Sequence, residues 1–185
     1  MTEALVKARV IASHGRNHLV QTVSGQRLTA TRKGKKGDVA VGDTVSVALG
    51  GSLGASIQTI DERKTLLFRQ DAVKTKVLAA NVDIMLVVFA PVPVFNPDFI
   101  WRALVAAYAG GIRPIVIRNK IDIKASQERA DAFEKSLKVL GYETIAMSAT
   151  EMSPEKVNEL LSLIEGKTSI LIGQSGMGKS TLLNR

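Results

Sequence analysis

The chain has 185 residues, 45% of them hydrophobic, so it can bury one large core or two small ones and is not wholly disordered. With no cysteine and two histidines, it cannot form disulfides or thiolate metal sites, and a histidine-based metal cluster is not expected. The net charge of +8 favours an anionic partner, and no apolar run nears the roughly 20 residues of a membrane span, so we expect a cytoplasmic protein without a membrane partner.

Residues 1–68 are predicted to form a small β-barrel. Short segments rich in Val, Leu, Ile and Thr alternate with turn residues, and no segment has the convincing period of a helix. Ser24-Gly25 suits a tight hairpin turn between two of these segments. The five predicted strands lie within residues 7–13, 18–24, 26–32, 41–49 and 55–63. Five-stranded barrels of this kind often bind nucleic acid on one face and its loops.

The basic residues of this region suggest where such a partner would bind. Residues 1–68 hold ten Lys or Arg and five Asp or Glu. Four of the ten lie in one glycine-punctuated run: Arg32, Lys33, Lys35 and Lys36. We predict that this run contacts RNA phosphates, the alternative being a solvated charged loop. The region has no aromatic residue before Phe68, which favours recognition of the RNA backbone over base stacking.

Residues 69–185 show a different pattern, in which apolar strands alternate with amphipathic helices. The run VDIMLVVFA at 82–90 is typical of a parallel strand that is covered on both faces. Further strands are predicted at 114–118, 144–147 and 169–172, and helices at 99–109, 126–140 and 153–164. Ser126 is the expected N-cap of the second helix, and Pro154 the first residue of the third. The alternation predicts a parallel, doubly wound α/β sheet, with a boundary near 65–72 that separates domains 1–68 and 69–185.

The segment GQSGMGKS matches the phosphate-binding loop G-x-x-x-x-G-K-[ST] and follows an apolar strand. Its glycines allow the backbone to wrap a phosphate and to direct several N–H groups at it. Lys179 is predicted to reach the β- and γ-phosphates of a nucleotide, and Ser180 to give a hydroxyl ligand to Mg²⁺. The alternative, a glycine-rich turn that binds nothing, does not explain why strand, loop and helix start occur together. The predicted phosphate-contacting residues are Gly173, Gln174, Ser175, Gly176, Met177, Gly178, Lys179, Ser180 and Thr181.

The segment NKID, directly after a predicted strand, suits recognition of guanine. The Asp122 carboxylate can accept hydrogen bonds from the N1–H and the exocyclic amine of guanine, a donor pair that adenine lacks. Asn119 is expected to brace the loop, and the stem of Lys120 to lie along the base, with Ile121 between them and Asp122. NKxD alone is a weak signal, because a polar capping turn can have the same residues.

A third segment, MSAT, places two small residues, Ser148 and Ala149, after the next predicted strand. A small turn lets backbone amides approach the base oxygen, although the motif has almost no specificity by itself. It falls at the carboxyl end of a strand, where the ligands of such sheets bind. The three segments therefore predict one guanine-nucleotide site.

The order of the three segments is unusual. In an ordinary GTPase the phosphate loop comes first and the base-reading segments come last, whereas here the phosphate loop follows them. All three segments are predicted at strand ends, so joining the old termini and cutting the chain elsewhere would leave the site intact. This order predicts a circularly permuted nucleotide-binding domain.

The permuted order, the preceding barrel and the segments AANVDIMLVVFA, PVFNPDFIWRALVAA, RNKID, MSA and GQSGMGKSTLLN resemble the circularly permuted, ribosome small-subunit-dependent GTPases, the RsgA/YjeQ family. The resemblance covers essentially the whole chain. It implies an oligonucleotide-binding (OB) type barrel followed by a P-loop GTPase domain, and late maturation of the 30S subunit as the function. It also implies GTP or GDP and Mg²⁺ as ligands, 16S rRNA of the small subunit as the partner, and a monomer.

The resemblance also implies segments that this sequence lacks. The DxxG motif that positions magnesium and water, the switch threonine region and a carboxy-terminal zinc domain would all follow Arg185. We therefore expect a truncated chain that hydrolyses GTP poorly, and no catalytic residue can be assigned within it. Two alternatives differ in class: a P-loop ATPase or kinase in which NKID is accidental, and a non-catalytic RNA-binding module.

Overall fold

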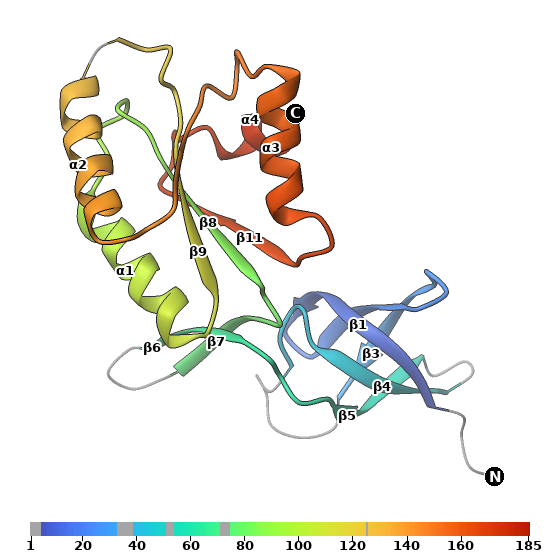
Figure 1. Cartoon of the computed structure of the whole chain (residues 1–185). Coiled ribbons are helices and arrows are strands. Elements are labelled where there is room, and N and C mark those ends of the chain that lie inside the picture. The colour runs from blue at the N-terminus through green and yellow to red at the C-terminus, as the bar shows by residue number, and fades with distance from the viewer. Residues whose placement is uncertain (1–4, 33–38, 51–53, 71–74, 125) are drawn as a thin grey trace. The chain divides into compact units, whose positions relative to one another are not determined.

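The computed structural model describes residues 5–32, 39–50, 54–70, 75–124 and 126–185 (Figure 1). Contacts divide the chain into two compact units, Met1–Val82 and Asp83–Arg185.

In the first unit, five of the described strands form a closed barrel in the order β1-β2-β3-β5-β4, and β4 pairs back onto β1. The bounds are β1 Leu5–His14, β2 Asn17–Thr22, β3 Arg27–Thr31, β4 Thr44–Leu49 and β5 Ala55–Ile60. The predicted five-stranded barrel is thus confirmed. Its core consists of small and β-branched side chains, which fit the narrow interior of a barrel of this size: Ala8, Val10, Val20, Ala30, Val39, Val45, Val47, Ala55 and Ile57.

A hairpin that the sequence analysis did not predict follows the barrel. Strands β6 (Leu66–Gln70) and β7 (Thr75–Ala80) pair antiparallel, with a register shift between Leu67 and Phe68. Contacts place this hairpin in the first unit, and the predicted boundary range 65–72 spans its first strand. An isolated two-stranded hairpin is marginally stable in water, and this one is held by contacts at the end of β7.

The turn Ala40–Asp43 makes those contacts. The N–H of Ala80 donates to the carbonyl of Val41 at 2.8 Å, and the side-chain amide of Asn81 donates to the carbonyl of Gly42 at 3.0 Å. Gly42 has a φ of +95°, and any side chain there would overlap the carbonyl oxygen of Ala80. Only glycine therefore allows the turn and the end of β7 to approach this closely.

A fully buried carboxylate, Asp43, stabilises the same turn. One of its oxygens accepts the N–H of Ala40 at 2.8 Å, and Arg63 donates through Nε and Nη2 at 2.8 and 2.9 Å. A bidentate guanidinium pair of this kind is among the stronger polar contacts in proteins. Because Arg63 lies between β5 and β6, it links the hairpin segment to the barrel.

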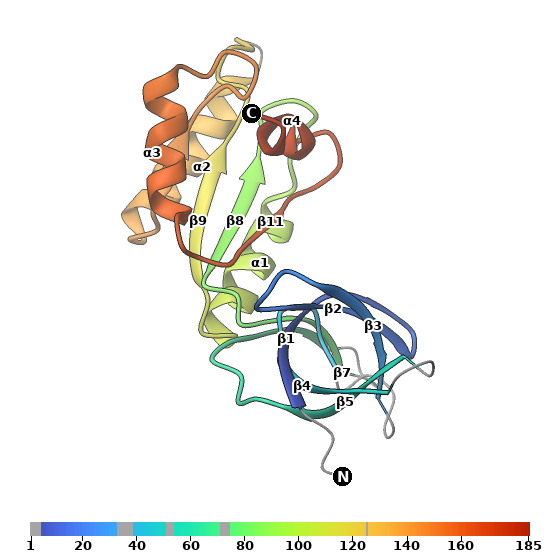
Figure 2. The same cartoon turned by 90° about the vertical axis from the view of Figure 1, so that its right-hand side faces the viewer.

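In the second unit, four described strands form a parallel sheet in the order β10-β9-β8-β11. Helices α1 and α2 lie on one side of this sheet and α3 on the other (Figures 1 and 2). Every residue of the central strand β8 is buried, as predicted for a strand covered on both faces. The bounds are β8 Ile84–Phe89, α1 Pro97–Ala109, β9 Arg113–Arg118, α2 Gln127–Val139, β10 Thr144–Ala146, α3 Pro154–Ile164, β11 Ser169–Ile172 and α4 Lys179–Leu183.

The helix caps agree with the sequence in part. Pro154 begins α3, and the Ser153 hydroxyl before it accepts the N–H of Lys156 at 3.3 Å. Ser126 precedes α2 as predicted, but its φ is +61° and its side chain makes no capping hydrogen bond. Ser126 is therefore the N-cap residue by position, without a side-chain cap. The left-handed backbone at Ser126 is a feature that sequence pattern alone does not reveal.

The first prediction concerns the buried Asp43–Arg63 pair. Replacing Asp43 by alanine should lower the free energy of unfolding by about 3 kcal/mol, because it leaves a largely buried guanidinium without its carboxylate. The matched control is Asp61→Ala, which removes the exposed pair between Asp61 and Lys7 and should cost less than about 1 kcal/mol. Chemical denaturation checks both variants, and equal midpoints for the two would contradict the prediction.

The second prediction concerns His18, which is buried in the barrel with its Nδ1 3.0 Å from the Ser13 hydroxyl. Burial lowers the pKa of His18, nearby Arg32 lowers it further, and Asp43 acts in the opposite direction. The folded state therefore disfavours the protonated ring, whereas the unfolded chain protonates near the ordinary value of 6.5. Stability should fall as the pH drops from 7 through this value toward the lower folded pKa.

Denaturation midpoints measured at a series of pH values check this dependence. The variant His18→Gln should have a flatter pH profile over that window, and His14→Gln, at an exposed position, should retain the wild-type profile. A His18→Gln profile as steep as that of the wild type would assign the slope to another group.

Candidate nucleotide-binding site

The three predicted loops follow parallel strands of one sheet and meet at one edge of it. Asn119 comes directly after β9, Ser148 lies just beyond β10, and Gly173 comes directly after β11. Because the strands are parallel, their carboxyl ends lie on the same side. Chain segments that are more than 50 residues apart are thus brought together.

The buried side chain of Asn119 joins all three loops. Its Oδ1 accepts the N–H of Ala149 at 2.9 Å, and its Nδ2 donates to the carbonyl of Met177 at 2.9 Å. Asn119 is 1% exposed, so both bonds are protected from competition with water. The side chain therefore braces the loop after β9 against the loops after β10 and β11.

Lys120 makes a second connection to the phosphate loop. Its ammonium donates to the carbonyl of Gly176 at 2.7 Å and to that of Val92 at 2.9 Å. Its φ of +63° is in the left-handed region, which turns the chain sharply after β9. The ammonium is therefore used to hold backbone, and the side-chain stem crosses the space between the two loops.

Two glycines of the phosphate loop allow close approach. A Cβ at Gly173 would lie 2.5 Å from the carbonyl oxygen of Val88, and one at Gly178 would overlap the amide nitrogen of Asn119. Gly178 also has a φ of +88°. Both positions thus require glycine for the loop to pack against β8 and the Asn119 brace.

The other predicted ligand residues differ in exposure. Asp122, Ser180 and Thr181 are exposed, whereas the side chain of Met177 is 1% exposed and belongs to the core. Met177 can therefore meet a ligand only through its backbone. Lys179 donates to the carbonyl of Gln174 at 2.7 Å, within the same loop.

Several contacts of this site had no sequence signal. Gln174 accepts the backbone N–H of Asn96 at 2.7 Å, and Arg185 donates to the carbonyls of Ala149 and Thr150 at 3.0 and 2.8 Å. Asn96 lies in the segment PVFNPDFIWRALVAA but in none of the three nucleotide-binding motifs, and its partner is 78 residues away. The proline-rich stretch before it marked the end of a strand but did not indicate a contact with the phosphate loop.

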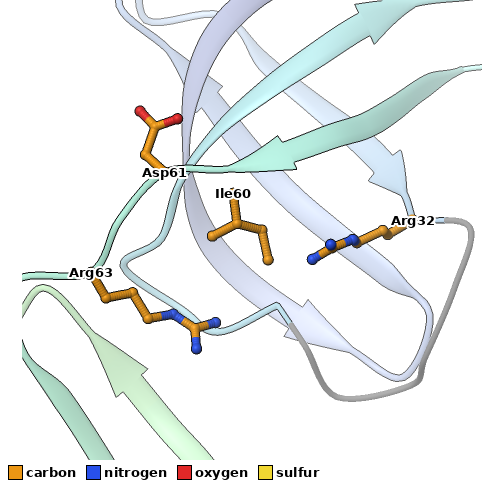
Figure 3. Close-up of a pocket in the computed structure, with 4 residues that line it drawn as sticks. All are labelled: Arg32, Ile60, Asp61 and Arg63. Carbon is orange, nitrogen blue, oxygen red and sulfur yellow. The ribbon is translucent and has the colours of Figure 1, made fainter.

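The barrel has a separate open cleft of about 300 Å³, lined by Arg32, Ile60, Asp61 and Arg63 (Figure 3). The side chains of Arg32 and Arg63 extend toward Ile60 from opposite sides, and the Asp61 carboxylate points away from them. Asp61 instead binds the Lys7 ammonium, at 2.6 and 2.7 Å. The predicted RNA-binding residues Lys33, Lys35 and Lys36 lie outside the described residues.

Within the described ranges, no group of three or more His, Cys, Asp or Glu side chains is placed to hold a metal ion. In the same part of the chain, no helix has both the length and the apolar character that crossing a membrane requires.

Comparison with known proteins identifies one family. The family model for the RsgA GTPase matches residues 60–185. A protein of Burkholderia pseudomallei (strain 1710b), named small ribosomal subunit biogenesis GTPase RsgA, is 41% identical over 179 residues, which are 96% of this chain and 57% of the relative. A protein of the same name from Ralstonia pickettii (strain 12J) is 43% identical over 176 residues, which cover 95% of this chain and 56% of the relative.

Solved structures agree with the fold. The crystal structure of YjeQ from Thermotoga maritima has a TM-score of 0.74 and 26% identity, and the match covers 98% of this chain and 64% of that one. The structure of YloQ, described as a circularly permuted GTPase, has a TM-score of 0.68 at 24% identity, again covering 98% of this chain and 64% of the other. The chain spans a little over half the length of the curated relatives that it matches. With an OB-type barrel before a partial, circularly permuted P-loop domain, it belongs to the RsgA GTPase family.

Proposed function

We propose that this chain binds GTP and GDP with Mg²⁺, and that the protein acts as a GTPase in the biogenesis of the small ribosomal subunit. The observation that carries the proposal is the Asn119 brace, which brings the predicted base-reading and phosphate-binding loops to one edge of one sheet. Relatives named small ribosomal subunit biogenesis GTPase support the activity and the partner. The rival ATPase or kinase and the non-catalytic RNA-binding module are not favoured by these comparisons.

The base site is built around the exposed carboxylate of Asp122. It accepts the N1–H and amine of guanine, and both bonds are strengthened by the negative charge. The turn with Ser148 and Ala149 closes the other side of the base. Because Asn119 holds the Ala149 N–H, the position of this turn relative to Asp122 does not depend on a ligand. Adenine is rejected because it would leave the carboxylate without donors.

The phosphate site uses the backbone of residues 173–178, the Lys179 ammonium and the start of α4. The loop has the close backbone packing at Gly173 and Gly178 that a phosphate cradle needs, and the exposed Ser180 provides a hydroxyl of the kind that Mg²⁺ prefers. Magnesium, when bound, neutralises charge that develops on the phosphates. Lys179 offers its ammonium to the β- and γ-phosphates, and Thr181 follows at the helix start. We assign no residue of this chain to the orientation of the attacking water.

The barrel supplies contacts to ribosomal RNA in this proposal. In the cleft of Figure 3, Arg32 and Arg63 point toward a common space, while the Asp61 carboxylate turns away and is neutralised by Lys7. Arg63 lines this cleft and also binds Asp43, and Arg32 lines it from the other side. The basic residues Lys33, Lys35 and Lys36 follow it directly in the sequence and extend the positive charge. Recognition by charge suits a barrel whose sequence has no aromatic residue before Phe68.

The third prediction tests the base site through Asp122→Asn. The amide replaces one acceptor with a donor, so GDP affinity should fall by roughly 100-fold or more while xanthosine diphosphate affinity rises. Isothermal titration calorimetry with GDP, XDP and ADP measures the exchange. The control is Glu151→Gln, an exposed carboxylate in the loop after β10, which should leave all three affinities unchanged. A GDP affinity that survives in Asp122→Asn would remove Asp122 from the base site.

The fourth prediction tests the barrel through Arg32→Gln. Each phosphate contact contributes about 0.7 to 0.9 to the slope of log affinity against log salt, so the variant should lose about that much of the slope in binding to small ribosomal subunits. Arg16→Gln makes the same change at an exposed position between β1 and β2 and should leave the slope intact. An Arg32→Gln slope equal to that of the wild type would exclude this residue from phosphate contact.

A further inference from the structure

The segment Val92–Asn96, between β8 and α1, is held against the phosphate loop although it carries no nucleotide-binding motif. The backbone N–H of Asn96 donates to Oε1 of Gln174 at 2.7 Å. The Pro93 ring makes a second contact with the phosphate loop. It lies so close to Gly176 that a Cβ on this glycine would be 3.0 Å from the ring. Lys120 adds a third link, because its ammonium binds the carbonyls of Val92 and Gly176 together.

Asn96 also begins α1. As the N-cap, its side-chain oxygen accepts the N–H of Asp98 at 2.9 Å, while its own N–H is the group given to Gln174. Its neighbour Phe95 is 2% exposed and packs with Phe89 and Phe133, at ring-centroid distances of 4.9 and 5.2 Å. The start of α1 is therefore fixed on one side by an aromatic cluster and on the other by the phosphate loop.

Gln174 connects Lys179 of the phosphate loop to Asn96 at the start of α1. Its backbone carbonyl accepts the ammonium of Lys179 at 2.7 Å, and its side chain accepts the N–H of Asn96. Lys179 is the residue that reaches the nucleotide phosphates in the function proposed above. A phosphate that restrains Lys179 and the loop backbone thus also restrains the residue that holds the cap of α1.

We propose that Gln174 is a positioning residue that couples nucleotide binding in the phosphate loop to order at the N-terminus of α1. This inference rests on the proposed nucleotide site and adds a role that the phosphate-loop motif does not require, because position two of the motif accepts any residue. The Gln174–Asn96 bond lies at an exposed site, so it is of ordinary strength and can open and close reversibly.

The coupling works in both directions. If a nucleotide strengthens the hold on Asn96, then a contact that holds Asn96 in the bound arrangement strengthens nucleotide binding by the same factor. Val94, in the middle of the segment, is 67% exposed, so the coupled segment reaches the surface of the unit. The proposed coupling therefore connects the nucleotide site to an exposed segment before α1, which is separate from the base-reading loops.

The fifth prediction tests this coupling by amide hydrogen exchange at Asn96, measured by NMR with and without saturating GDP. In the wild type, GDP should slow exchange at Asn96. In Gln174→Leu, exchange without nucleotide should be about fivefold faster than in the wild type, the ratio expected for loss of one ordinary hydrogen bond, and GDP should no longer slow it. Gln174→Glu keeps an acceptor oxygen and should restore the nucleotide-free rate of the wild type.

The control Gln58→Leu makes the same chemical change on β5 of the barrel and should alter neither the rate of exchange at Asn96 nor its response to GDP.

Trp101 is the only tryptophan of the chain and its ring lies 5.6 Å from that of Phe133, so its fluorescence gives a second readout of the α1 environment. Calorimetry on the same samples separates the two proposals. The coupling alone is overturned if GDP binds the wild type without changing exchange at Asn96, or if GDP slows this exchange equally in Gln174→Leu. If GDP does not bind the wild type, the proposed function is overturned and the coupling with it.

Discussion

One buried amide side chain determines the geometry of the proposed nucleotide site. Asn119 uses its oxygen to hold the loop after β10 and its nitrogen to hold the loop after β11. Neither loop is connected to the other by a short stretch of chain, so noncovalent bonds must set their separation. A buried donor and acceptor that lost these partners would each be costly, which makes the arrangement strongly preferred over alternatives. Gly178 belongs to the same constraint, because any side chain there would overlap the Asn119 amide.

This constraint explains how a permuted chain order can retain the site. The links that matter run between strand ends, through Asn119 to Met177 and through Lys120 to Gly176, and they do not depend on which segment is made first. The parallel sheet, in the order β10-β9-β8-β11, places the carboxyl ends of those strands at the same edge. Chain connectivity can therefore change while the contacts that position the loops remain.

Local signals were sufficient for much of the fold and for the motif residues. The alternation of apolar strands and helices in the second unit, and the short β-rich segments in the first, follow from hydrophobic period and turn residues. The phosphate loop could be read because close backbone approach requires glycines at fixed spacing. The convergence of the three loops followed from one rule, that ligands of parallel sheets bind at the carboxyl ends of strands.

What the sequence did not reveal depends on partners far along the chain. The β6–β7 hairpin is short and is held by the turn at Gly42, about 40 residues earlier. The bond from Asn96 to Gln174 joins two residues that have no shared pattern. Ser126 has the identity and position of a cap, but its backbone is left-handed and its side chain makes no capping hydrogen bond. Such features arise from tertiary packing, which neither propensity nor spacing encodes.

The close fit between Gly42 and the end of β7 has a consequence for how this protein can be divided. The match to the family model starts at residue 60, yet the compact unit that holds the barrel continues to Val82. A cut at the start of that match would separate Arg63 and Asn81 from Asp43 and Gly42, and so remove the hydrogen bonds between them. The start of the family match and the end of the compact unit therefore fall at different residues. Gene fusions, recombination or recombinant fragments that respect only the former would break a folded module.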